Sequence, residues 1–146
     1  MYCGSGSIGL YCADRTERVV GIELNPQAVG DARSNALAFG VVQAEYHAMD
    51  ASAFAQTPAL LDLWNDPGAV AVMDPPRPGL SADVRQLLLA HPVERWVYVS
   101  CNPDALARDL AVLTPLYRIE TVQPVDLFPH TPHMETVVFL SRGVHR

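Results

Sequence analysis

Cys101 lies where an apolar run meets a helical pattern, in the stretch "VYVSCNPDALARDL". A helix that begins just after a cysteine stabilises its thiolate, because the helix N-terminus carries partial positive charge. This position leaves two interpretations open, a nucleophilic thiolate and a small buried residue. Cys3 and Cys12 have no such helix behind them, and we expect both to be packing residues.

A candidate base for this nucleophile is Glu135, which opens the last apolar run in "FPHTPHMETVVFL". A carboxylate at the edge of a sheet can serve as a general base. His130 and His133 precede it in a loop stiffened by prolines, where we expect solvated side chains. Two histidines and a glutamate without any further ligand cluster do not favour a metal, so no metal site is predicted.

The stretch "GSGSIG", from Gly4 through Gly6 to Gly9, has the spacing G-x-G-x-x-G. Glycines at this spacing let the backbone turn tightly and approach a ligand closely. Glu23 ends the next apolar run, where a carboxylate can accept hydrogen bonds from both ribose hydroxyls of an adenosine. Together they predict a nucleoside cofactor, with a plain glycine turn beside a surface glutamate as the alternative. NAD fits the same pattern.

Two further carboxylates favour S-adenosyl-L-methionine over NAD. Asp50 follows the apolar run 44–48, where its side chain can face the adenine amine. Asp74 begins "DPPRPG", which follows the buried run 69–73, and ligands of open α/β sheets bind at that carboxyl end of the strands. The prolines of this loop restrict its backbone and hold Asp74 at the strand tip.

The elements that position these residues alternate along the chain. The apolar periodicity predicts strands at 19–24, 44–48, 69–73, 95–100, 117–123 and 135–140, and helices at 26–39, 51–64, 81–90 and 103–113. Such alternation is typical of an α/β fold with a mostly parallel, doubly wound sheet, here with an antiparallel last strand. A strand should precede the glycine turn, yet only Met1 to Cys3 do so, and we expect that first strand to be truncated. Residues 1–146 are predicted to form a single domain.

The composition of the chain limits the kinds of partner that it can bind. The chain has 146 residues, of which 49% are hydrophobic and 18% charged, as in a globular domain with a core. No apolar run is long enough to span a bilayer, and no secretory signal is evident, so no membrane partner is predicted. Without a C-x-x-C pair we expect reduced thiols and a cytoplasmic location. The formal charge of −6 means that RNA, if bound, would be gripped mainly by other parts.

Five stretches together resemble the RNA uracil-5-methyltransferase family. They are, in matching order, "YCGSGSIGL", "GIELNPQAV", "DPPRPGL", "YVSCNPDALARDL" and "VDLFPHTPHMETVVFL". The resemblance implies a Rossmann-like methyltransferase fold that uses S-adenosyl-L-methionine, with Cys101 as nucleophile and Glu135 as general base. It also implies cofactor contacts from Tyr2, Ser7, Glu23 and Asp74, with Asp50 near the adenine. Gly4 and Gly6 belong to the same loop.

The implied reaction is methylation of C5 of a uridine in tRNA or rRNA. In that family a thiolate adds to C6, C5 takes the methyl group, and a base removes the C5 proton so that the cysteine can leave. The resemblance further implies that N-terminal RNA-binding domains, which residues 1–146 do not include, hold the RNA. The alternatives are an inactive fragment of such an enzyme, an amino-methylating enzyme that would not need Cys101, and an NAD-binding domain.

Overall fold

The computed structural model describes residues 1–127, 129–131 and 134–143. The chain forms two compact units, Met1–Phe54 and Ala55–Arg146. No boundary was evident from the sequence pattern, and the assignment of residues 1–146 to a single methyltransferase domain stays a prediction. The two units are described separately.

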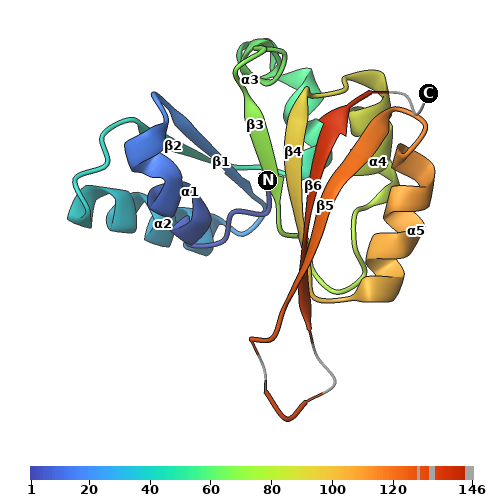
Figure 1. The fold of residues 1–146 in the computed structure, drawn as a ribbon. Helices are drawn as coiled ribbons and strands as arrows, with labels where there is room; N and C mark the ends of the chain where they lie inside the picture. Colours follow the sequence, from blue (N-terminus) through green and yellow to red (C-terminus); the bar gives the residue numbers. More distant parts are fainter. Residues whose placement is uncertain (128, 132–133, 144–146) are drawn as a thin grey trace. The chain divides into compact units, whose positions relative to one another are not determined.

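The Met1–Phe54 unit contains a two-stranded parallel sheet (Figure 1). Its elements are α1 (Ser7–Cys12), η1 (Ala13–Arg15), β1 (Val19–Glu23), α2 (Pro26–Ala38), β2 (Ala44–Ala48) and the start of η2 (Ala51–Gln56). The register runs from Val19 opposite Ala44 to Glu23 opposite Ala48. Met1 to Cys3 form no strand, although the Cys3 amide donates to the Ile22 carbonyl at 3.1 Å.

Helix α2 packs on β2 through an apolar stripe. Val29, Ala32 and Ala36 are buried and contact Tyr46, which is also buried. Their spacing of three and four residues keeps them on one helix face. Asn25 caps the helix by accepting a hydrogen bond from the Gln27 amide at 2.9 Å.

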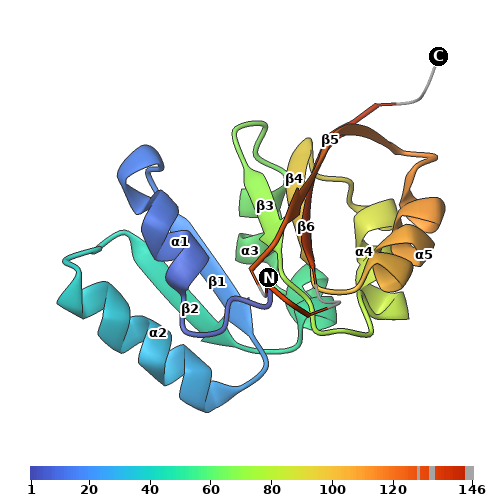
Figure 2. The same cartoon turned by 60° about the horizontal axis from the view of Figure 1, so that its bottom comes forward.

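The Ala55–Arg146 unit contains a four-stranded sheet in the order β3-β4-β6-β5. Its elements are α3 (Pro58–Trp64), β3 (Val70–Met73), α4 (Ala82–Ala90), β4 (Arg95–Ser100), α5 (Pro103–Leu113), β5 (Tyr117–Val125) and β6 (Glu135–Arg142). Strands β3 and β4 are parallel, and β6 is antiparallel to both β4 and β5. Helices α4 and α5 lie together on one face of this sheet (Figures 1 and 2). The predicted antiparallel last strand is confirmed.

Strand β4 supplies the aromatic centre of this unit. Trp96 and Tyr98 are buried and stack with ring centroids 5.7 Å apart, and Trp96 meets the edge of Tyr117 at 5.6 Å. Because side chains alternate along a strand, Ser100 is buried on the same face. The end of β4 is therefore packed on the helix side just before Cys101.

Two predictions need correction. Residues 51–64 are not one helix but η2 followed by α3, with Thr57 extended at φ −110° and ψ 98°. Pro58 explains the break, since the residue before a proline is disfavoured in the helical region. Cys12, expected to be a packing residue, is exposed, because it ends the short helix α1, which has no buried residue.

Candidate functional site

The glycine loop of the Met1–Phe54 unit has a conformation that excludes other residues at one position. Gly6 has φ +83°, and a Cβ built on it would lie 2.8 Å from the hydroxyl oxygen of Tyr46. The ring of Tyr46 thus fills the space beneath the loop and leaves room only for a glycine. The loop turns into α1 at Ser7, which is exposed.

Glu23 at the end of β1 holds the loop on one side and the next turn on the other. Its Oε2 accepts from the Gly4 amide at 3.1 Å, and its Oε1 accepts from the Asn25 amide at 2.9 Å. Each carboxylate oxygen can accept a second hydrogen bond. The half-buried carboxylate therefore has capacity left for two hydroxyl donors, as an adenosine ribose requires.

Asp50 follows β2 and is exposed. Its Oδ1 accepts from the amide of Ser52 at 2.8 Å and from its hydroxyl at 2.5 Å, and these bonds hold the pKa of the Asp50 carboxyl below its usual value. An ionised carboxylate suits an amine donor such as that of adenine. Tyr2 has a positive φ of 57°, a conformation that is uncommon outside glycine and marks the entry to the loop.

The residues of this first group fit an adenosyl cofactor. The loop offers glycine backbone at Gly4 and Gly6, and β1 and β2 deliver Glu23 and Asp50 at their carboxyl ends, where ligands of α/β sheets bind. The assignment of cofactor contacts to these residues stays a prediction.

The second group lies in the Ala55–Arg146 unit, at the edge where β3 and β4 end and β6 begins. The antiparallel ladder of β4 and β6 ends at the pair Ser100 and Thr136. Cys101 directly follows Ser100, and Glu135 directly precedes Thr136. Asp74 directly follows β3, which is the neighbour of β4 on its other side. Three adjacent strands thus bring these side chains to one edge.

The two carboxylates of this edge influence each other. Burial raises the pKa of Glu135, and the negative charge of Asp74 raises it further. Burial also raises the pKa of Asp74. A carboxyl group whose pKa is raised is a stronger base once it is ionised, which suits proton removal from carbon.

Cys101 sits in a turn that Ser100 and Asn102 brace. The Ser100 hydroxyl donates to the Asn102 carbonyl at 3.0 Å and accepts from the Asn102 amide at 3.2 Å. Asn102 is the N-cap of α5, and its side chain accepts from the Asp104 amide at 3.1 Å. Cys101 therefore stands directly before the positive end of an eleven-residue helix, as its sequence position predicted.

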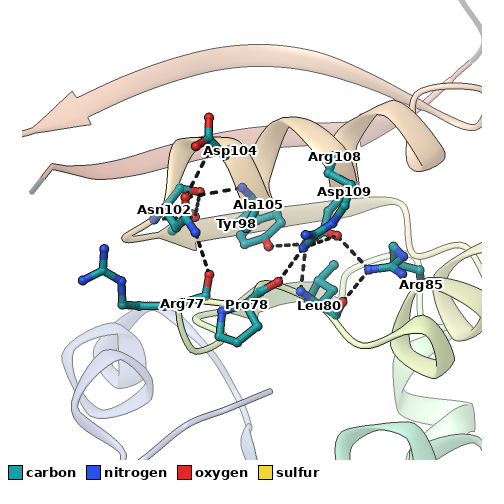
Figure 3. Close-up of polar contacts among 11 residues, drawn as sticks. Arg77, Pro78, Leu80, Arg85, Tyr98, Asn102, Asp104, Ala105, Arg108 and Asp109 are labelled. Atoms are coloured by element: carbon teal, nitrogen blue, oxygen red, sulfur yellow. Dashed lines mark hydrogen bonds and ion pairs between the residues drawn. The ribbon is translucent and has the colours of Figure 1, made fainter.

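Sequence reasoning missed a polar network behind this edge, centred on Asp109 and drawn in Figure 3. Asp109 is fully buried on the face of α5 that also buries Ala105, Leu106 and Leu113. A charged residue on an otherwise apolar helical stripe was a readable signal, since carboxylates are almost never fully buried unless they are paired.

The remaining predictions about this edge concern the histidine loop. His130 is exposed and has a positive φ of 70°, whereas His133 lies outside the described residues. Across residues 1–127, 129–131 and 134–143, no group of three or more metal-binding side chains occurs. No helix in that same part of the chain is long and apolar enough to cross a membrane.

Solved structures define the class of protein first. The chain superimposes on the TrmK protein of M. capricolum, solved with S-adenosylhomocysteine, with a TM-score of 0.73 at 11% identity, covering 98% of this chain and 60% of that one. At this identity the likeness shows the fold alone. It is a Rossmann-like fold, and together with the 34% identical methyltransferase structure described below it confirms the predicted fold class.

The family follows from closer relatives. The model described as tRNA (uracil-5-)-methyltransferase matches residues 1–143, and the chain belongs to that family of S-adenosyl-L-methionine-dependent RNA methyltransferases. An uncharacterised RNA methyltransferase of Bacillus cereus is 41% identical over 97% of this chain, and one of Nitratidesulfovibrio vulgaris is 42% identical over 97%.

One similar protein of known structure is named for its substrate. The Pyrococcus abyssi tRNA (uracil-54, C5)-methyltransferase, in complex with S-adenosyl-L-homocysteine, matches 96% of this chain at 34% identity with a TM-score of 0.78. The chain spans 33% of that protein and 30% of the Bacillus cereus and Nitratidesulfovibrio vulgaris relatives.

Proposed function

We propose that the protein transfers a methyl group from S-adenosyl-L-methionine to C5 of a uridine in tRNA or rRNA through a covalent bond between Cys101 and C6. The observation that carries the proposal is the register of β4 and β6, whose last pair is Ser100 and Thr136, the residues next in the chain to Cys101 and Glu135. A nucleophile and a base in adjacent positions can act on adjacent atoms of one ring.

Each residue has a defined role in this reaction. The Cys101 thiolate forms a bond to C6, and the electron pair of the C5–C6 double bond moves toward C5 and O4, which makes C5 nucleophilic. The cofactor supplies the methyl group that C5 accepts. Glu135 then takes the proton from C5, the double bond reforms, and the C6–sulfur bond breaks to release the thiolate.

The environment of Glu135 supports its role as the base. Proton removal from carbon needs a base whose pKa lies nearer to the operating pH than that of an ordinary carboxyl group. Burial and the charge of Asp74 raise the pKa of Glu135 in that direction. Ser7, Glu23 and Asp50 would hold the nucleoside part of the cofactor, together with Tyr2 and the glycine loop.

Trapping with 5-fluorouridine RNA tests the covalent step. In the full protein that carries this sequence, RNA with fluorine at C5 plus S-adenosyl-L-methionine should yield a protein–RNA adduct on a denaturing gel, because fluorine cannot leave as a proton. Cys101→Ala should abolish the adduct. Cys12→Ala, which removes an exposed cysteine, is the matched control and should leave the adduct unchanged.

A second variant separates formation of the covalent adduct from its release. Glu135→Gln should still form an adduct with ordinary RNA but release it slowly, because only the last step needs the base. Full methylation activity in Cys101→Ala would overturn the covalent mechanism and favour an amino-methylating enzyme, which needs no thiolate.

The RNA is expected to be bound mainly by parts of the protein outside residues 1–146. The formal charge of this chain is −6, whereas affinity for nucleic acid rests largely on cations that neutralise phosphates. A target base that is stacked or paired must also be extruded before Cys101 can reach C6. The cytoplasmic location stays a prediction.

A further inference from the structure

The loop that carries Asp74 is tied to helix α5 at three successive points (Figure 3). The side chain of Asn102 donates to the Arg77 carbonyl at 3.0 Å, and Arg108 donates to the Pro78 carbonyl at 2.5 Å. Asp109 accepts from the Leu80 amide at 2.7 Å. We call Asn102, Arg108 and Asp109 the α5 clamp.

Asp109 is the centre of the clamp, and its buried charge is fully partnered. Besides the Leu80 amide, its carboxylate accepts from the Tyr98 hydroxyl at 2.7 Å and from Arg85 at 2.8 Å. Arg108 adds an ion pair at 3.6 Å. A buried carboxylate that lost these donors would be strongly destabilising, so the arrangement has one well-defined geometry.

The backbone of the loop is shaped to meet this carboxylate. Gly79 has φ +83°, and a Cβ built there would lie 2.4 Å from Oδ2 of Asp109. Only a glycine lets the chain pass so close to the buried charge. Leu80 is then held from both sides, because Arg85 donates to its carbonyl at 2.5 Å.

The same helix fixes the turn that contains Cys101. Asn102 caps α5 and is itself bonded to Ser100, so Cys101 lies between two anchored residues. The clamp and the turn thus share Asn102, which is hydrogen-bonded to both Ser100 and the loop. Each clamp bond restrains the Asp74 loop relative to Cys101, so the loss of one bond should loosen the loop.

We propose that Arg108 and Asp109 are positioning residues, which set the Asp74 loop, whose carboxylate is expected to contact the cofactor, against Cys101, so that the methyl donor and the thiolate meet at one uracil ring. This role rests on the proposed function, because it matters for the reaction only if Cys101 and the Asp74 edge take part in it. Displacements of about 1 Å in such an arrangement can cost a factor of about 100 in rate.

Arg108→Met tests the role with little risk to the fold, because the Arg108 side chain is 56% exposed. In the full protein that carries this sequence, kcat for RNA methylation should fall about tenfold or more, while KM for RNA stays unchanged. Amide hydrogen exchange at Gly79 and Leu80 should become faster.

Arg118→Met is the matched control, because the Arg118 side chain is 59% exposed and its partner is Glu120 on β5. It should leave both kcat and loop exchange unchanged. Asp109→Asn is the stronger variant and should lower kcat further. Restoring a cation in Arg108→Lys should recover part of the loss.

Faster loop exchange in Arg108→Met with an unchanged kcat would overturn the positioning role and leave the clamp as a purely structural feature. Unchanged exchange would overturn the clamp itself. If the wild-type protein neither methylates RNA nor forms the 5-fluorouridine adduct, the proposed function fails and the positioning role fails with it. The exchange measurement would still report on the clamp in that case.

Discussion

Glu23 combines structural and binding capacity in one carboxylate. It organises the glycine loop by accepting from Gly4, and it organises the following turn by accepting from Asn25. Its remaining lone pairs are free for ligand hydroxyls. Any substitution of Glu23 should therefore weaken cofactor binding in two ways, because ligand contacts are lost and the glycine loop is loosened.

Glu23→Ala is expected to weaken the binding of S-adenosyl-L-homocysteine about tenfold or more, since hydrogen bonds to a charged group contribute about 1.5–3 kcal/mol. Isothermal calorimetry measures the loss. Glu17→Ala, which removes an exposed glutamate of the same unit, should bind like the wild type. Tighter binding of NAD than of S-adenosyl-L-homocysteine would contradict the cofactor assignment.

The pair of Asp74 and Glu135 predicts a definite dependence on pH. The pKa of each group is raised by burial, and that of Glu135 also by the charge of Asp74. A group whose folded pKa lies above its unfolded value stabilises the fold fully below the unfolded pKa, and this contribution is lost as the pH rises through the folded pKa. Ionisation of these two carboxyl groups as the pH rises should therefore lower the free energy of unfolding.

Glu135→Gln is accordingly expected to raise Tm at pH 7, and the gain should vanish below about pH 4, where an ordinary glutamate is protonated. Thermal melts at both pH values measure it. Asp74→Asn should lower the pKa of Glu135 in an NMR titration, because the neighbouring charge is removed. A Tm gain of equal size at both pH values would show that packing, and not charge, is responsible.

Helix α5 is the element that links the Asp74 loop to the turn of Cys101. Asn102 caps it by accepting from the Asp104 amide, and the same side chain donates to the Arg77 carbonyl of the loop. An aspartate in this position could cap the helix but could not donate. Two substitutions of Asn102 therefore distinguish its role as the helix cap from its hydrogen bond to the Arg77 carbonyl.

Asn102→Ala should lower the free energy of unfolding by about 1 kcal/mol, the usual cost of a lost N-cap. Asn102→Asp should keep most of that stability yet still accelerate hydrogen exchange in the loop. Urea unfolding and exchange measure the two effects. Ser81→Ala, which removes the cap of α4, is the control and should lower stability without affecting Asn102. If loop amides exchange equally fast in Asn102→Asp and in the wild type, the hydrogen bond from Asn102 to the Arg77 carbonyl does not hold the loop.

At the scale of the whole molecule, the charge of −6 limits what residues 1–146 can do with RNA on their own. Binding of polyanions depends on protein cations that displace counterions from the phosphates, and this chain has 10 Lys and Arg residues against 16 Asp and Glu residues. The curated relatives from Bacillus cereus and Nitratidesulfovibrio vulgaris are about three times longer than the stretch that matches, since this chain covers 30% of them.

Residues 1–146 expressed alone are expected to bind tRNA weakly and to show little or no methylation. Fluorescence anisotropy with labelled tRNA and incorporation of labelled methyl groups measure both. A cation-rich unrelated domain of similar size serves as the control for nonspecific binding. Robust methylation by residues 1–146 alone would show that the acidic charge does not limit RNA recognition.

The sequence by itself determined the elements and the kinds of chemistry. Apolar periodicity located α2, α5 and the strands to within a few residues, because the periods of helix and strand differ. The stretch at 51–64 escaped it, since the break at Thr57 follows from a proline effect that periodicity does not record. Cys101, with Asn102 and Pro103 after it, was already readable as a cysteine before a helix N-terminus.

Only the tertiary structure decided which residues meet. Cys101 and Glu135 are far apart in the chain. They come to the same edge of the sheet because β6 enters beside β4 in one register, and a slip by one residue would turn Glu135 to the other face. The α5 clamp likewise could be found only from the way that the elements pack together. A buried Asp109 is tolerable only where Leu80, Arg85 and Tyr98 converge on it, and that convergence is a property of packing between elements and not of any local pattern.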